Sequence, residues 1–453
     1  MDDRRIWCQH AALPSGVVDG VLVTISDGIV VRIDTNVEWP TDSHRLEGLT
    51  LPGLANAHSH AFHRALRGRT HSGAGDFWTW REQMYAIAGR LTPENYLPLA
   101  RAVFAEMLQA GYTCVGEFHY VHHLPSGDPY LERNAMGYAV IEAARQTGIR
   151  LTLLDACYLH GGISQPLSEQ QRRFSDGSAQ SWVDRVAALL AVNGATDREA
   201  TVRIGAAIHS VRAVDASAIA VVARFAAAHA MPLHAHVSEQ LAENDQVGGA
   251  YGCSPTELLA QQGALSQMFT AIHATHLSDG DVSLYGAAEC TCCLCPTTER
   301  DLADGIGPSC ELRTAGVRLA IGSDQHAVID PFEEMRGIEL DERLASMKRG
   351  NHPPRDLLQA ATTNGYRCLG WANGGSITVG ALADFVTIGL DSVRLAGLSP
   401  HALVDAAVFC ASASDVRTVI VAGRTVVADG RHVDLDVGGE LSRAISALYE
   451  DVA

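Results

Sequence analysis

The segment LTLPGLANAHSH, residues 49–60, is the part of the chain from which the expected fold follows. Its apolar residues predict a buried strand from Leu49 to His58, and polar residues, Ser59 and His60, follow directly. Residues two apart on a strand share a face, so the imidazoles of His58 and His60 can point the same way. A core strand that ends in paired histidines is a candidate for one part of a functional site at the carboxyl edge of a sheet.

Seven further apolar segments follow this strand, and helical stretches separate them. The additional predicted strands are Cys114–Tyr120, Arg150–Leu159, Val202–His209, Pro232–His236, Met268–His273, Cys292–Cys295 and Val317–Asp324. The clearest predicted helices are Tyr96–Ala110, Leu131–Thr147, Ala216–Ala230 and Pro331–Leu344. Eight strand–helix units over about 300 residues favour an α/β fold of the (β/α)8 TIM-like barrel type. No GxGxxG sequence opens a helix after an early strand, so a dinucleotide-binding sheet has no support.

Both ends of the chain have a different pattern, that of short strands joined by tight turns. Residues 17–34 alternate apolar and polar positions around Asp27-Gly28, which predicts a β-hairpin. Three more short strands are predicted near the other end, at 383–388, 416–421 and 424–427. We therefore expect a small β-sandwich domain built from both termini, with residues 1–50 and 383–453, around a hydrolase barrel of residues 51–382.

Charge and composition exclude several classes of protein. The chain has 34 Lys and Arg against 52 Asp and Glu, a net charge of −18, whereas nucleic acids and anionic membranes need clustered cations. The first residues contain no apolar run that resembles a signal-peptide core. The longest apolar region, 216–230, contains Arg224 and His229 and is too short to span a bilayer. We expect a cytoplasmic protein that binds neither nucleic acid nor membrane.

The eleven cysteines form an odd number spread over a long chain, which favours reduced thiols over a disulfide framework. Four of them lie in the apolar segment CTCCLCP, at positions 290, 292, 293 and 295. Zinc knuckles place C-x2-C pairs on turns, whereas a strand sends neighbouring side chains to opposite faces. Buried structural thiols are the favoured interpretation, and a metal or redox role is the alternative.

Nearly every predicted barrel strand ends in a polar or titratable residue. These residues are His58, His60, Glu117, Tyr120, His209, His236, His273 and Asp324. A barrel interior is filled by Val, Ile and Leu, so packing alone does not explain this set. In a barrel all strand carboxyl ends converge on one face, where such enzymes place their active sites.

Four of these side chains have the composition of a zinc site. His58, His60 and His236 supply imidazole nitrogens and Asp324 a carboxylate oxygen, a set that leaves positions for water or substrate. A single histidine pair would more often cap a strand or hydrogen-bond in a core. The full set at successive strand ends predicts one Zn²⁺ per chain, and Fe²⁺ or Mn²⁺ could use the same ligands.

Glu239, His273 and Asp324 are the predicted catalytic residues. Glu239 lies three residues after His236, where the chain has left the strand and can turn its carboxylate back toward the metal. A carboxylate there can accept a proton during attack by water and return it to a leaving amine. His273 and Asp324 could orient or deprotonate that water. The alternative for Glu239 is a carboxylate that stabilises a helix N-terminus.

At this level of detail the chain resembles the amidohydrolase superfamily, in its mononuclear deaminase branch. The resemblance rests on PGLANAHSH (Pro52–His60), HAHVSE (His234–Glu239), HATHL (His273–Leu277) and GSD (Gly322–Asp324), in that order. It covers almost the whole chain, including the terminal β strands.

Longer segments outside the metal motif are similar to those of the formimidoylglutamate deiminase family. They are HSHAFHRALRG (58–68), FWTWREQMY (77–85), EFHYVHH (117–123), HSVRAV (209–214), CPTTERDLADG (295–305) and SDQHAVIDPFEEMRGIELDERL (323–344). This resemblance implies a homodimer that hydrolyses the formimino C=N group of N-formimino-L-glutamate in histidine degradation, with N-formyl-L-glutamate and ammonia as products.

A dicarboxylate substrate needs local cations, because the protein as a whole is acidic. Arg81 and Arg212 are the candidates on that argument, and the family resemblance points to the same two, with Tyr120 and His209 as hydrogen-bonding neighbours. Either arginine taken alone would more often be a surface or salt-bridge residue. Family members carry Gln three residues after the second metal histidine, where this chain has His63, which we place in the substrate site as well.

Two other functions fit parts of the pattern. A deaminase of the same branch could act on an aminated heterocycle such as guanine, cytosine or an adenosine derivative, although a neutral base does not need two arginines. A non-catalytic barrel used for assembly is the alternative from another class, and it would have lost its ligands. Trp80 is expected to be a packing residue, and Glu333, Glu334 and Glu339 are expected on a solvated helix face.

Overall fold

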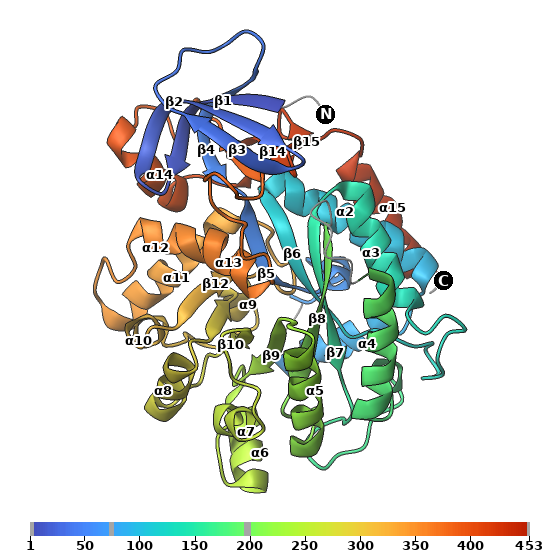
Figure 1. Cartoon of the computed structure of the whole chain (residues 1–453). Helices are drawn as coiled ribbons and strands as arrows, with labels where there is room; N and C mark the ends of the chain where they lie inside the picture. Colours follow the sequence, from blue (N-terminus) through green and yellow to red (C-terminus); the bar gives the residue numbers. More distant parts are fainter. Residues whose placement is uncertain (1–3, 72–76, 194–200, 451–453) are drawn as a thin grey trace.

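The computed structural model describes residues 4–71, 77–193 and 201–450, which form two eight-stranded sheets and the helices around them (Figure 1). One sheet is a parallel barrel in the middle of the chain. The other combines strands from both ends. The predicted fold class, a (β/α)8 barrel with a small β domain built from both termini, is confirmed.

The barrel strands follow one another in space in the same order as in the sequence, and all neighbours are parallel. They are β5 (Leu54–Ser59), β6 (Tyr112–His119), β7 (Arg150–Cys157), β8 (Val202–Ser210), β9 (Leu233–Val237), β10 (Phe269–His273), β11 (Thr291–Leu294) and β12 (Arg318–Ile321). All eight predicted strands therefore exist, most of them within a few residues of the expected bounds.

The first and last strands close the barrel by a short seam. The backbone of Ser59, at the end of β5, is bridged in parallel to Asp324, just after β12. Asp324 N–H donates to His58 C=O at 3.0 Å, and His60 N–H donates to Asp324 C=O at 3.1 Å. Two of the predicted ligand segments are thereby hydrogen-bonded to each other through their main chains.

The predicted first strand, 49–58, is in fact two strands that belong to different sheets. β4 (His44–Pro52) pairs with β1 (Arg4–Leu13) and β13 (Phe385–Ile388) in the terminal sheet, and β5 begins at Leu54 in the barrel. Gly53 lies at the corner between them, where an added Cβ would meet Thr113 Oγ1 at 2.3 Å and the Tyr366 hydroxyl at 2.7 Å. The continuous apolar pattern conceals this corner because both strands are buried.

Helices surround the barrel and connect its strands (Figure 1). They are α1 (Phe77–Ala88), α2 (Pro93–Ala110), α3 (Ala135–Thr147), α4 (Ala179–Asn193), α5 (Ala216–Ala228), α6 (Leu241–Tyr251), α7 (Pro255–Gln261), α8 (Asp279–Ala287), α9 (Pro296–Asp301), α10 (Ser309–Thr314), α11 (Pro331–Ser346), α12 (Pro354–Gln359) and α13 (Gly365–Cys368). The short 3-10 helices η1 (Ala61–Leu66) and η2 (Arg172–Phe174) and the π-helix η3 (Ala360–Asn364) complete this part. The four predicted helices correspond to α2, α3, α5 and α11.

Local sequence explains where these helices begin and end. The Thr92 side chain accepts from Asn95 N–H and the Asn95 side chain from Thr92 N–H, a capping box that begins α2. Asp215 caps α5 in a similar way, by accepting from the N–H groups of Ser217 and Ala218. Gly111 ends α2 in the left-handed conformation at φ 106°, which costs least for glycine.

The terminal sheet takes four strands from each end of the chain, in the order β16-β15-β14-β13-β4-β1-β2-β3. Its strands are β1 (Arg4–Leu13), β2 (Gly16–Ser26), β3 (Ile29–Asp34), β4, β13 (Phe385–Ile388), β14 (Val416–Val421), β15 (Arg424–Ala428) and β16 (Arg431–His432). The predicted hairpin turn at Asp27-Gly28 is present, with φ of 49° and 72°. Ala422-Gly423 turns in the same way between β14 and β15.

The C-terminal segments also contribute helices. α14 (Leu403–Phe409) lies between the short turns η4 (Pro400–Ala402) and η5 (Ala413–Asp415), and α15 (Val437–Tyr449) is the last helix described. α15 packs on α2, where Arg101 Nε donates to Glu440 Oε2 at 2.9 Å (Figure 1). Within the described residues, no helix combines the length and the apolar character that a membrane crossing requires.

Two of the glutamates expected on a solvated face of α11 are buried, so that prediction was wrong for them. Glu334 accepts from the hydroxyl and the N–H of Thr297, and Glu339 accepts from the N–H groups of Gly350 and His352. Both are fully buried, because their carboxylates accept hydrogen bonds from the start of α9 and from the loop after α11, donors that the helical pattern does not reveal. Glu333 is partly exposed and pairs with Arg300, as expected of a surface residue.

A buried ion pair connects the barrel to the terminal sheet. Arg150 at the start of β7 donates through Nε to Asp384 Oδ2 at 2.5 Å and through Nη2 to Oδ1 at 3.1 Å. Tyr366 donates its hydroxyl to the same carboxylate at 2.8 Å, and Ala422 N–H donates to it at 2.7 Å. Asp384 directly precedes β13, so this cluster fixes the C-terminal strands on the barrel.

We expect Arg150→Met to lower the free energy of unfolding by about 3–5 kcal/mol, because it leaves the buried Asp384 carboxylate without its cation. Urea denaturation followed by circular dichroism measures the effect. Arg32→Met is the matched control, since Arg32 pairs with Asp34 on the surface and its removal should hardly move the midpoint. Equal shifts in the two variants would contradict the role given to Arg150.

Candidate metal centre and substrate pocket

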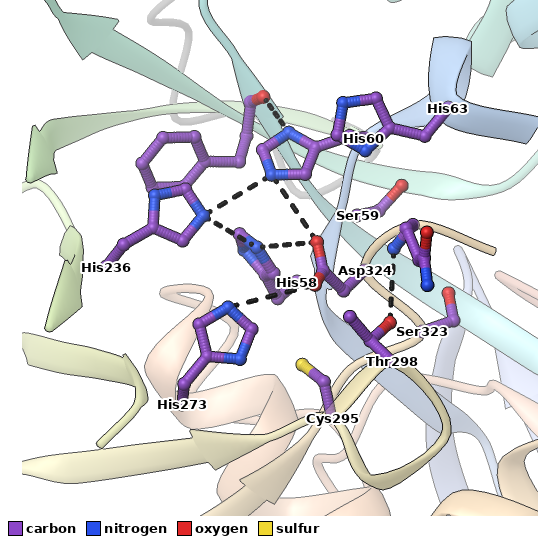
Figure 2. Close-up of polar contacts among 12 residues, drawn as sticks. His58, Ser59, His60, His63, His236, His273, Cys295, Thr298, Ser323 and Asp324 are labelled. Atoms are coloured by element: carbon purple, nitrogen blue, oxygen red, sulfur yellow. Dashed lines mark hydrogen bonds and ion pairs between the residues drawn. The ribbon is translucent and has the colours of Figure 1, made fainter. Parts of the chain in front are cut away.

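Side chains from four barrel strands meet at the carboxyl edge of the barrel (Figure 2). His58 comes from β5, and His60 follows that strand directly. His236 comes from β9, His273 ends β10, and Asp324 follows β12. All five are buried, and Figure 2 shows the four histidine rings arranged around the Asp324 carboxylate.

The donor atoms of this cluster are about as far apart as ligands of one ion. His236 Nε2 lies 3.1 Å from His58 Nε2 and 3.4 Å from His60 Nε2. Asp324 Oδ1 lies 3.3 Å from His58 Nε2 and 3.5 Å from His60 Nε2. Bonds of about 2.0–2.1 Å in a tetrahedron place ligand atoms about 3.3 Å apart, so the cluster fits a zinc ion without rearrangement.

Two hydrogen bonds determine which ring nitrogen faces the centre. His60 Nδ1 donates to Phe118 C=O at 2.9 Å, and His236 Nδ1 donates to His209 C=O at 2.8 Å. Both Nε2 atoms therefore present lone pairs to each other. Lone pairs that converge in a buried site repel one another unless a cation lies between them, which favours a metal over a purely structural histidine cluster.

The protonation states agree with a ligand role. Burial lowers the pKa of His58, His60 and His236, which keeps their imidazoles neutral at neutral pH. Burial alone would raise the pKa of Asp324, but its interactions with His58, His273 and His60 hold it below its usual value. Neutral imidazole and ionised carboxylate are the forms that bind metal.

His273 and Asp324 have unusual backbone conformations, with φ of 66° and 43°. Left-handed φ is rare for residues other than glycine, and such strain concentrates at functional sites. The conformation turns both side chains into the cluster just where their strands end. His273 Nε2 lies 3.7 Å from Asp324 Oδ2, and its position relative to His58 and His236 also admits it as a ligand.

Glu239 lies beside this group, with Oε1 at 3.7 Å from His273 Nε2. Burial raises the pKa of Glu239. Burial opposes the charge of His273, but the carboxylates of Glu239, Glu299 and Asp324 raise its pKa well above the usual value. A buried carboxyl next to an imidazole gives the centre two groups that can hold and exchange a proton.

Two arginines lie in the pocket that opens from the cluster. Arg81 of α1 and Arg212, just after β8, line the same pocket as His60, His236 and Asp324. They also line an outer hollow formed with residues 161–165, so they lie where the inner pocket joins the surface. Guanidinium groups at this junction can bind carboxylates of a molecule whose other end reaches the cluster.

Arg212 is held by two acidic residues. Its Nη2 lies 3.8 Å from Glu239 Oε2, and its Nε lies 3.4 Å from Glu243 Oε2 on α6. Burial opposes the charge of Arg212, but Glu243 and Glu239 raise its pKa. The guanidinium is therefore positioned between Glu239 and a second, fully buried carboxyl group, that of Glu243.

The remaining predicted substrate residues line the same pocket. Tyr120 and His63 are hydrogen-bonded through the hydroxyl and Nε2 at 3.0 Å. Burial lowers the pKa of His63 to about 3, so its ring is neutral at neutral pH. His209 stacks edge-on against Tyr120, with centroids 5.3 Å apart. Trp80, expected to be only a packing residue, also lines the pocket and contacts the His63 ring edge-on at 5.1 Å.

Three acidic residues that support the site had no role assigned from the sequence. Glu117 accepts from Ser59 Oγ at 2.5 Å and Ala61 N–H at 2.7 Å, which holds the chain on both sides of His60. Glu299 faces His273 Nδ1 at 3.3 Å, and Glu243 faces Arg212. Glu117 and Glu299 lie in segments shared with the family, but their partners are far away in the sequence.

The four clustered cysteines 290, 292, 293 and 295 are buried and free, as expected of structural thiols. Cys295 lies near the centre, since its sulfur is within 4.8 Å of ligand atoms of His273 and Glu299. Figure 2 shows it below the His58 and Asp324 side chains.

Comparison with known proteins adds an independent finding. The model of the amidohydrolase family matches residues 49–426. Formimidoylglutamate deiminase of Pseudomonas aeruginosa is 38% identical over 442 residues, which cover 94% of this chain and 95% of that protein.

Two solved structures extend the comparison. An amidohydrolase from Brucella melitensis has a TM-score of 0.91 and 31% identity, and the match covers 98% of this chain and 100% of the other. An adenosine deaminase from Xanthomonas campestris with bound zinc has a TM-score of 0.85 and 23% identity, and it shows the same fold over 99% of this chain and 98% of its own.

Proposed function

The chain belongs to the amidohydrolase family, and we propose that it hydrolyses the formimino group of N-formimino-L-glutamate to N-formyl-L-glutamate and ammonia. The observation that carries this proposal is that Arg81 and Arg212 line the same pocket as the histidine–aspartate cluster. A substrate with two carboxylates at one end and an amidine at the other matches that arrangement. The similarity to the Pseudomonas deiminase over almost the whole chain supports it.

We assign one zinc ion per chain to His58, His60, His236 and Asp324. The spacing of their donor atoms and the two fixed tautomers support this set, and the zinc in the Xanthomonas deaminase agrees with it. Fe²⁺ and Mn²⁺ could use the same ligands. When bound, such an ion activates water and polarises the group under attack.

In the proposed reaction, water adds to the formimino carbon, the imino nitrogen gains two protons and leaves as ammonia, and the oxygen stays as the formyl group. Arg81 and Arg212 bind the two carboxylates and thereby place the amidine near His273 and Asp324. Those two residues orient the water. Glu239 takes a proton at its carboxylate and delivers it to the departing nitrogen.

Tyr120, His63 and His209 complete the substrate site in this proposal. The neutral His63 ring has one N–H to share between Tyr120 and the substrate, whereas a glutamine would offer two hydrogens and a carbonyl. Contacts at this position therefore differ from those of family members with glutamine.

A cytoplasmic location, a role in histidine degradation and a homodimer remain predictions. All eleven cysteines are free, which supports a reducing compartment. The pathway and the dimer rest on the family resemblance.

Ammonia release from N-formimino-L-glutamate is the direct test of the function. We expect turnover by the purified protein, loss of turnover after chelation, and recovery when about one equivalent of Zn²⁺ is restored. Adenosine, guanine and cytosine are the comparison substrates. Turnover of one of these, with none of the formimino compound, would overturn the proposal in favour of a heterocycle deaminase.

We expect Glu239→Gln to lower kcat about 10²–10⁴-fold, because the amide cannot carry the proton to the leaving group. Metal content, measured by elemental analysis of the same sample, should stay at the wild-type level. Glu169→Gln, a change at an exposed position, is the control and should keep full activity. Retained activity in Glu239→Gln would remove this residue from the mechanism.

We expect Arg212→Met to raise KM for N-formimino-L-glutamate about 10- to 100-fold, the cost of one charge-assisted contact. The change should be smaller for an amidine without carboxylates, which separates lost substrate binding from general damage to the site. Arg224→Met, at an exposed position on α5, is the matched control. An unchanged KM in Arg212→Met would refute the role of this residue.

A further inference from the structure

A second group of potential metal ligands lies outside the substrate pocket, where α10, α11 and the loop before α12 come together (Figure 1). Cys310 belongs to α10, Glu342 to the last turns of α11, and His352 to the loop between α11 and α12. None of the three lines the pocket described above. The sequence pattern did not single them out.

The geometry of this group suits a tetrahedral ion. Cys310 Sγ lies 3.7 Å from His352 Nε2, and the ligand atoms of Cys310, Glu342 and His352 all lie within 4.8 Å of one another. Zinc bonds of about 2.3 Å to sulfur and about 2.0–2.1 Å to nitrogen place the two atoms about 3.6 Å apart. Ser309 Oγ, at 2.9 Å from His352 Nε2 and 3.1 Å from Glu342 Oε2, marks a fourth position.

The charge balance at Glu342 points to a cation. Glu333, Glu339 and Asp341 on the same helix are each paired with an arginine. Within the described residues, no arginine, lysine or histidine makes an ion pair with Glu342, although only 8% of this residue is exposed. The fully buried Glu334 on the same helix is held by Thr297 without a paired cation among the described residues, so the charge of Glu342 supports a cation site only together with the ligand geometry.

His352 is a buried ligand of this group, whereas Cys310 is partly exposed. His352 is 1% exposed, and burial lowers the pKa of its imidazole, so the ring is in the neutral form that binds metals. Cys310 is partly exposed, which leaves a route for the ion. Burial and the neighbouring Glu342 raise the pKa of the Cys310 thiol to about 11, so a metal has to displace the thiol proton as it binds.

We propose that Cys310, Glu342 and His352 form a second zinc site, with Ser309 Oγ or water as the fourth ligand. The ion connects α10, α11 and the segment 347–353, which otherwise meet through hydrogen bonds such as that from His352 N–H to Glu339. This site is independent of the reaction proposed above. Without a metal, the same atoms form a hydrogen-bonded chain from His352 through Ser309 to Glu342, and this is the competing explanation.

Cobalt substitution of the full-length protein distinguishes the two explanations. The chelated protein is reloaded with Co²⁺ and desalted. We expect two equivalents of cobalt and a thiolate-to-cobalt charge-transfer band, which the ligand set proposed for the first site lacks because it contains only nitrogen and oxygen donors. Cys310→Ser should lose the band and one equivalent, and Cys253→Ser, at another partly exposed cysteine, should lose neither. A single equivalent without the band, or a band that persists in Cys310→Ser, would overturn the proposal.

A second measurement needs no variant, so it holds even where Cys310→Ser fails to fold. Alkylation of the wild-type protein is followed by mass spectrometry with and without Zn²⁺. We expect zinc to slow the modification of Cys310 about tenfold and a chelator to restore it, because a metal-bound thiolate is protected. The exposed Cys410 is the internal control and should react equally in both samples. Equal reactivity of Cys310 with and without zinc would also overturn the proposal.

Discussion

The seam that closes the barrel is the constraint on which the candidate active site depends. Two backbone hydrogen bonds, from Asp324 to His58 and from His60 to Asp324, connect the first strand to the end of the last. The same three residues supply most of the proposed metal ligands. Closure of the barrel at this seam therefore brings the imidazoles of His58 and His60 next to the Asp324 carboxylate.

The buried carboxyl group of Glu117 also holds the carboxyl edge of the barrel in place, although it does not belong to the histidine–aspartate cluster. Glu117 holds the chain around His60 through Ser59 and Ala61, and it accepts a third hydrogen bond from Tyr96 at 3.2 Å. A carboxyl group in an apolar core is stable only when its oxygens find such donors. The loop that carries His60 is therefore fixed by a side chain from the neighbouring strand.

Because the protein as a whole is acidic, the two arginines of the pocket stand out as local positive charges. With a net charge of −18, the overall field of the chain does not attract anions, so an anion that entered the pocket would depend on the local charges of Arg81 and Arg212. Arg212 is placed between Glu239 and Glu243, so an anion bound to Arg212 would also change the surroundings of the Glu239 carboxyl group. In the proposed reaction, substrate binding and proton transfer therefore share one guanidinium group.

The sequence by itself determined the barrel, the two-ended β domain and the residues that meet at the carboxyl edge. Apolar strands and the polar residues that end them are evident from neighbouring positions in the sequence. Because the carboxyl ends of parallel barrel strands lie on one face, these polar residues come together in one site. Only the tertiary structure decided that residues 49–58 divide between two sheets at Gly53, that Glu334 and Glu339 are buried, and that Glu243 lies beside Arg212. The physical reason is that a carboxyl group is stable in the interior only when other groups hydrogen-bond to it or pair with its charge. Here those partners come from segments that meet only when the chain is folded.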